Sequence, residues 1–171
     1  MPSEKILKYC ILVFFTLLQS RIPYGACLMK TNSSLVFSPL VQPAQFLNDE
    51  QIPKDAVTYS WGYRKSTIQT ATVLRKKPIK LLNTEECKAE KNNQEVQKFD
   101  DVTQICGRPS FLCYNDFGSP TFALINKTSV LIGIASHPDY CNFQGPFNAI
   151  YIKITQDLRS WMSSVDQTIT I

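Results

Sequence analysis

The chain has 171 residues, a formal net charge of +4, and a composition that is 44% hydrophobic and 11% aromatic. These values are typical of one globular domain and exclude an intrinsically disordered chain. Basic residues are scattered except in one cluster, which we interpret as a solvated face or loop, with a surface for an acidic partner as the alternative. The cluster comprises Arg75, Lys76, Lys77 and Lys80. This distribution does not indicate binding to nucleic acid.

The first residues have the order of a secretory signal peptide. Lys5 and Lys8 precede an apolar run from Cys10 to Leu18, and polar residues follow. The run is far shorter than the roughly 20 residues that a membrane-spanning helix needs. We therefore predict a signal peptide at residues 1–26, a secreted protein and no membrane span. The alternative is that this stretch forms a core strand.

Six cysteines in a chain with a secretory leader favour disulfides, because the secretory pathway is oxidising. Cys10 lies inside the predicted leader. The cysteines form no CxxC pair and the chain has one histidine, so neither a metal site nor a cofactor is expected. The sequons at Asn32 and Asn126 predict glycosylation of an extracellular protein.

Short apolar runs separated by Pro, Gly, Asn and Asp predict an all-β domain, a small barrel or sandwich. Strands are expected at residues 57–61, 68–74, 79–82, 121–125, 130–136 and 149–154. Asn83 or Thr84 is expected to cap a short helix that runs toward Asn92. Residues 155–165 predict a terminal helix with one apolar face, formed by Leu158, Trp161, Met162 and Val165.

Residues 113–120, Cys-Tyr-Asn-Asp-Phe-Gly-Ser-Pro, resemble the nucleophile loop of the trypsin and chymotrypsin family, whose usual form is Cys-x-Gly-Asp-Ser-Gly-Gly-Pro. The flanks resemble the family in order, at residues 28–43, 60–62, 74–87, 133–136 and 151–154, together with Trp161. The resemblance implies the second six-stranded antiparallel barrel of the trypsin-like fold with a C-terminal helix. It also implies that the first barrel is largely missing, so that residues 27–171 form a partial trypsin-like domain.

The resemblance implies two disulfides, Cys87 with Cys106 and Cys113 with Cys141. A further pair found in many vertebrate members is absent, because its two places hold Ala56 and Ala123. Cys27 has no partner in the family pattern, so it is either free or used between chains.

The resemblance also implies that the catalytic groups are absent. Acyl transfer in this family needs a serine oxygen, a histidine that accepts its proton and a carboxylate that orients the histidine. Phe117 stands at the nucleophile position and Gly25 at the carboxylate position. The neighbouring Ser119 stands at a glycine position and is not expected to replace the nucleophile. The single histidine, His137, stands where the family has a tryptophan beside the cleft. We interpret it as a cleft-wall or loop side chain, with a metal or proton-transfer role as the alternative.

The specificity pocket looks degenerate by the same comparison. Phe111 stands at its base, and Pro138 replaces a wall glycine whose backbone normally pairs with substrate. Ser136 and His137 complete this set of pocket residues. The motif retains Asp116, Gly118 and Pro120. In active members the aspartate accepts the freed N-terminus, and here we interpret Asp116 as a structural remnant that forms hydrogen bonds within its loop.

We therefore expect a secreted, catalytically inactive serine protease homologue that acts by protein binding, as a cofactor, decoy or regulator of proteolysis. Its partner is expected to be an extracellular protein, either an active protease or a protease substrate. One alternative is a truncated isoform or gene-model fragment without autonomous function, because half of a two-barrel fold exposes an apolar interface. An active endopeptidase is the least favoured alternative.

Overall fold

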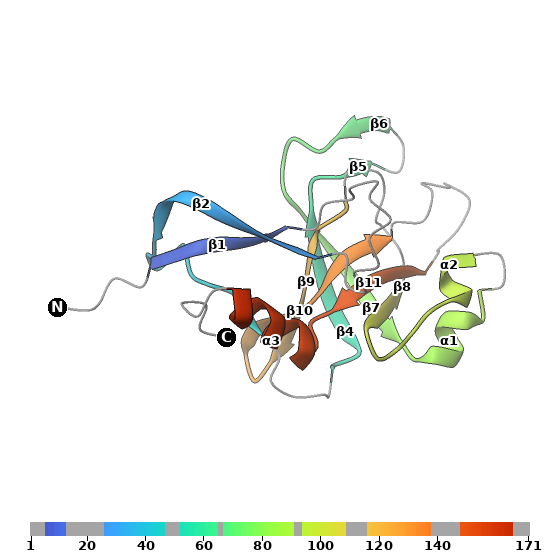
Figure 1. The fold of residues 1–171 in the computed structure, drawn as a ribbon. Coiled ribbons are helices and arrows are strands. Elements are labelled where there is room, and N and C mark those ends of the chain that lie inside the picture. The colour runs from blue at the N-terminus through green and yellow to red at the C-terminus, as the bar shows by residue number, and fades with distance from the viewer. Residues whose placement is uncertain are drawn as a thin grey trace.

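Six strands form a closed antiparallel barrel at the centre of the molecule, in the order β11-β8-β7-β4-β9-β10 (Figure 1). The computed structural model describes residues 6–12, 26–46, 52–64, 67–90, 94–108, 116–137 and 148–165. β10 pairs with both β9 and β11, which closes the barrel. The strands are β4 (Asp55–Ser60), β7 (Arg75–Leu82), β8 (Gln104–Arg108), β9 (Pro120–Ile125), β10 (Thr128–His137) and β11 (Ala149–Lys153). The predicted six-stranded antiparallel barrel is confirmed.

The strand expected at residues 68–74 is not part of the barrel. In place of residues 68–74, the structure has β6 (Thr67–Thr70), which pairs with β5 (Tyr63–Arg64) in a separate two-stranded sheet. The sixth barrel strand is instead β8, which the sequence analysis missed. Its residues Gln-Ile-Cys-Gly-Arg include one aliphatic side chain and show no alternation of apolar and polar residues, so the usual signal of a strand is absent.

A two-stranded hairpin extends away from the barrel (Figure 1). It pairs β1 (Ile6–Leu12) with β2 (Cys27–Val36). β1 lies within the range predicted as a signal peptide. The alternative for this stretch was a core strand, whereas β1 pairs with β2 in a sheet separate from the barrel. The signal peptide itself stays a prediction. A further short strand, β3 (Gln45–Phe46), pairs in parallel with β10 on the outside of the barrel.

The first helix, α1 (Thr84–Lys88), begins with a complete capping box. The side chain of Asn83 accepts a hydrogen bond from the Glu86 amide at 2.8 Å, and the Glu86 carboxylate accepts one from the Asn83 amide at 3.0 Å. Asn83, rather than Thr84, is therefore the N-cap. A second short helix, α2 (Gln94–Gln97), follows and was not predicted.

The predicted C-terminal helix is present as α3 (Gln156–Val165). Its buried face is narrower than expected, because Leu158 and Met162 are buried while Trp161 is 39% and Val165 53% exposed. Arg159 joins the buried face. No helix in the described ranges combines the length and apolar character that crossing a membrane requires.

Three hydrophobic clusters hold these elements together. The largest fills the barrel interior with side chains from all six strands, among them Ile79, Ile132 and Tyr151. The second lies between the outer wall of β10 and β11 and the helix α3. The third surrounds the disulfide between Cys87 and Cys106, whose Cα atoms lie 6.1 Å apart, and joins α1 to β8. This is the first pair that the family resemblance implied.

Candidate functional site

The segment that resembles a nucleophile loop forms a tight turn at residues 116–119. The Ser119 amide donates to the Asp116 carbonyl at 3.1 Å, and Gly118 has a φ of 79°, a left-handed conformation that favours glycine. The Gly118 amide donates to the Ala135 carbonyl at 2.9 Å, and the Ala135 amide donates to the Ser119 carbonyl at 2.9 Å. These bonds fix the turn against β10. The Phe117 ring, carried at its centre, is half-buried.

Asp116 anchors the turn from the inside of the protein. Its carboxylate is fully buried and uses both oxygens. Oδ1 accepts a hydrogen bond from the Gly62 amide at 2.8 Å, and Oδ2 lies 2.9 Å from Nζ of Lys77 on β7. A Cβ on residue 62 would lie 2.0 Å from Oδ1, so this approach requires glycine. The turn is thus tied to the end of β4 and to β7 as well as to β10.

One expectation from the sequence is corrected here, and another is extended. Lys77 is not part of a solvated face, because its side chain is 8% exposed and its ammonium pairs with Asp116. Asp116 forms the expected hydrogen bond within its loop through its carbonyl, which accepts from the Ser119 amide, and its carboxylate bonds in addition to Gly62 and Lys77 in other segments. A buried carboxylate needs a cation and hydrogen-bond donors to offset the loss of hydration. Lys77 and Gly62 supply both.

Polar groups continue into the barrel interior beside this ion pair. The hydroxyls of Thr58 on β4 and Thr121 on β9 are 2.9 Å apart and buried. Tyr151 on β11 is fully buried. Burial raises the pKa of the Tyr151 hydroxyl above its ordinary value of 10.0, the hydroxyl of Thr58 lowers it, and the charge of Asp116 raises it further. At neutral pH Tyr151 therefore keeps its proton.

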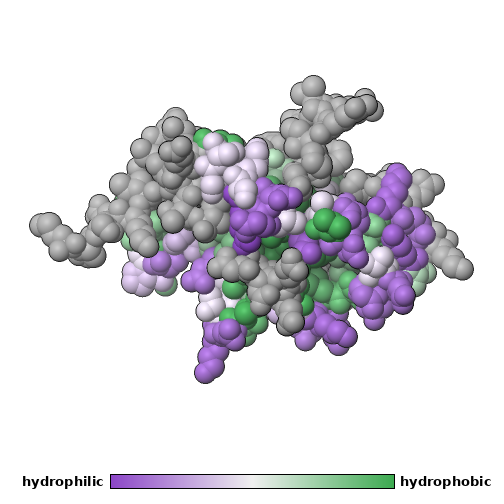
Figure 2. Space-filling model, turned by 60° about the horizontal axis from the view of Figure 1, so that its bottom comes forward, coloured by the Kyte–Doolittle hydropathy of each residue, from purple (hydrophilic) through white to green (hydrophobic). Residues whose placement is uncertain are grey.

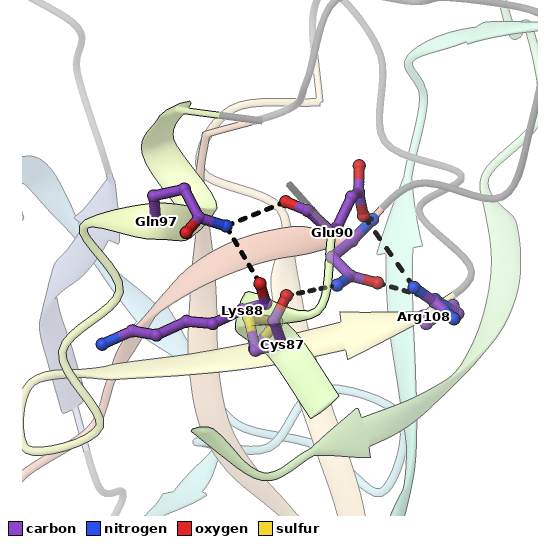
Figure 3. A network of polar contacts seen from close by, with 7 residues as sticks. Cys87, Lys88, Glu90, Gln97 and Arg108 are labelled. Atoms are coloured by element: carbon purple, nitrogen blue, oxygen red, sulfur yellow. Dashed lines mark hydrogen bonds and ion pairs between the residues drawn. A yellow bond between two sulfur atoms is a disulfide. The ribbon is translucent and has the colours of Figure 1, made fainter. Parts of the chain in front are cut away.

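A second polar network joins α1 and the residues just after it to β8 and to the residue that precedes β11 (Figure 3). Asn148, which is 1% exposed, lies at its centre. Its side-chain amide donates to the Cys87 carbonyl at 2.9 Å, its side-chain oxygen accepts from Nε of Arg108 at 2.7 Å, and its backbone amide donates to Glu90 Oε2 at 2.7 Å. Arg108 and Glu90 also form an ion pair with a separation of 4.0 Å. The network fixes the chain just before residue 109 and just after residue 147.

A family model described as Trypsin matches residues 14–162 of the chain. The chain belongs to the trypsin family. The matched range contains all six barrel strands, the turn at residues 116–119 and most of α3.

Within this trypsin-family barrel, the structure places only some of the expected site residues. Phe117, Asp116 and Gly118 lie together in the turn, and Pro120 begins β9. Ser136 is half-buried near the end of β10, and the backbone of His137 ends that strand. The other residues expected at the site lie outside the described ranges: Gly25, Phe111, Cys113, Pro138 and Cys141.

The two predicted glycosylation sites lie in different surroundings. Asn126 is exposed at the two-residue turn between β9 and β10, where Asn126 has a φ of 49° and Lys127 one of 66°. These positive values fit a type I′ hairpin turn, in which asparagine is favoured. Asn32 lies within β2, and Cys27 begins the same strand.

Sequence reasoning missed Lys77 and Asn148 as residues that shape the site. For Lys77 a signal was available, because side chains two apart on a strand share a face. Counting back from the buried Ile79 assigns Lys77 to the barrel interior, beside an acidic motif residue. For Asn148 the sequence offers no comparable signal, since its partners come from α1 and β8 and are distant along the chain.

Proposed function

We propose that this trypsin-family protein is secreted, is catalytically inactive, and acts by binding other extracellular proteins as a cofactor, decoy or regulator of proteolysis. One observation carries the proposal. The turn that presents the nucleophile in the family resemblance is held by β10, Gly62 and Lys77, and its central residue is Phe117. A phenyl ring has no lone pair with which to attack a carbonyl carbon and no proton to give to a base.

The nearest hydroxyl in the turn does not replace the nucleophile. Ser119 is 8% exposed, so the residue offers little surface to an incoming peptide. Its backbone amide and carbonyl are both used to hold the turn. Moving the Ser119 backbone outward would break the hydrogen bonds to Asp116 and Ala135 that define the turn. The scaffold is therefore retained while the reacting atom is replaced.

Secretion is supported by the order of charged, apolar and polar residues at positions 5–20 and by the exposed sequon at Asn126. The disulfide between Cys87 and Cys106 fits an oxidising compartment. In that compartment the natural partners of a protease-like surface are active proteases and their substrates. Binding without cleavage allows the chain to occupy, present or shield such a partner.

The proposal is tested by mixing the purified chain with a panel of active trypsin-family proteases and their protein substrates. The expected result is a stable complex in size-exclusion chromatography and a changed rate of cleavage by the bound protease. The chain alone is expected to leave peptide p-nitroanilide substrates intact. Hydrolytic activity that co-elutes with the chain would show that it is an enzyme. If no member of the panel forms a complex with the chain, the proposed binding function is contradicted.

A further inference from the structure

The outer face of three neighbouring barrel strands carries apolar side chains. On β4, Ala56, Thr58 and Ser60 are buried, so the alternate residues Val57 and Tyr59 face outward. The same alternation on β7 and β9 turns further apolar residues outward, namely Pro78, Phe122 and Leu124. Hydrophobic residues also lie exposed between hydrophilic ones on the face drawn in Figure 2.

The strand register brings these outward side chains into one continuous strip. Val57 lies between Pro78 on one side and Phe122 on the other. The rings of Tyr59 and Phe122 meet edge to face, with centroids 6.0 Å apart and planes at 72°. Leu124 ends the strip and is 69% exposed. Leu124 follows Phe122 on the same face of β9, and Tyr59 lies toward the other end of the strip. Exposed apolar side chains in such a row form a surface that a partner can cover.

Lysines border this strip along its β7 side. Lys76 lies opposite Tyr59, and Lys80 lies opposite Asp55. Both lysines are exposed, and within the described part of the chain neither forms an ion pair. Asp55 is the single acidic residue of β4, β7 and β9. The border therefore carries a net positive charge.

We propose that this lysine-bordered strip, formed by the outward residues of β4, β7 and β9, binds an extended segment of an extracellular protein in which acidic residues flank aromatic or aliphatic ones. An apolar centre with a polar border is the usual composition of a protein-binding surface. Acidic side chains of the partner complement the ammonium groups of Lys76 and Lys80, which favours fast association and the choice of partner. The inference rests on the proposed protein-binding function and names the chemistry of the partner.

The test selects peptides from a random 12-residue phage library on the full, disulfide-intact chain. Enriched sequences are expected to combine Asp or Glu with Leu, Trp or Phe. Labelled copies are then titrated against the wild-type chain and variants by fluorescence anisotropy. Lys76→Glu/Lys80→Glu is expected to weaken binding by about tenfold or more, and rising salt is expected to weaken binding to the wild type.

Two controls make the result specific. Lys88→Glu/Lys98→Glu changes the net charge by the same amount at other exposed lysines, and it is expected to leave binding unchanged. Leu124→Ser tests the apolar part and, because Leu124 is exposed, is expected to weaken binding without lowering the unfolding midpoint. Circular dichroism of each variant reports folding independently.

Three outcomes overturn the inference: no enrichment of acidic and apolar residues, binding that survives Lys76→Glu/Lys80→Glu, or binding confined to vesicles that contain phosphatidylserine. The failure of the proposed function looks different. Cleavage of the selected peptides by the chain would disprove catalytic inactivity without contradicting binding at the strip. Complexes with extracellular proteins that persist in Lys76→Glu/Lys80→Glu would instead support the proposed function and show that the binding surface is not the strip.

Discussion

Ala56 of β4 and Ala123 of β9 are direct partners across two antiparallel strands, and both side chains are buried in the barrel interior. By the family resemblance of the sequence, these are the expected places of a disulfide that many vertebrate members have. The structure therefore retains the strand pairing that such a bond would cross-link, although neither cysteine is present. The methyl groups of the two alanines occupy this part of the barrel core instead.

This relationship predicts that Ala56→Cys/Ala123→Cys forms a new disulfide in oxidising buffer. The bond is expected to raise the free energy of unfolding by about 2–4 kcal/mol, because it restricts the unfolded chain. Denaturant unfolding with and without reductant measures the gain, and Ala56→Cys alone is the control. Free thiols at both positions in the oxidised, folded protein would contradict the observed register.

The buried ion pair between Lys77 and Asp116 predicts a large loss of stability when its cation is removed. Lys77→Met leaves the Asp116 carboxylate buried without its ammonium partner, which is expected to lower the free energy of unfolding by about 3–5 kcal/mol. Lys76→Met, at the neighbouring exposed position, is expected to change it by less than about 0.5 kcal/mol. Chemical denaturation measures both.

A double variant separates the ion pair from general disruption. Lys77→Met/Asp116→Asn removes both charges, so its destabilisation is expected to be smaller than the sum of the two single effects. Equal destabilisation by Lys77→Met and Lys76→Met would instead mean that the pair does not hold the turn.

Tyr151 predicts a loss of stability at alkaline pH. Because burial raises the pKa of Tyr151 in the folded protein, the unfolded chain loses this proton at a lower pH than the folded protein does. The contribution of this group to the free energy of unfolding is therefore fully present below pH 10.0 and is lost as the pH rises above it. The decline is expected to approach about 1.4 kcal/mol per pH unit for this group. Tyr151→Phe should flatten the profile above pH 10, measured by denaturant unfolding at successive pH values. An unchanged slope would exclude Tyr151 as the cause.

The hairpin turn at Asn126 predicts glycosylation when the chain passes through the secretory pathway. The side chain is exposed at the turn, and its sequon is intact. Secreted wild-type chain is expected to lose apparent mass on treatment with peptide N-glycosidase, and Asn126→Gln is expected to lose part or all of that shift. A chain that is secreted without any glycosidase-sensitive mass would refute this prediction, and Asn32→Gln serves as the comparison at the other sequon.

The sequence predicted the fold because the family motifs and the regular apolar strands agree. It failed where a short-range pattern is weak or is overruled by distant contacts. β8 has too few apolar residues to stand out, yet its pairing with β7 and β11 completes the barrel. Lys77 belongs to a basic run that looks solvated, and only the strand alternation and the distant Asp116 reveal its burial. Trp161 has the right helical spacing but faces away from the region that Leu158 and Met162 cover.

The most direct measurement is covalent labelling of the purified, disulfide-intact chain by a fluorophosphonate probe, with an active trypsin-family protease labelled in parallel. Since Phe117 provides no oxygen to phosphonylate, the chain is expected to remain unlabelled at probe concentrations that saturate the protease. Stoichiometric labelling of the chain, mapped by mass spectrometry to Ser119, Ser136 or any other serine, would contradict the account.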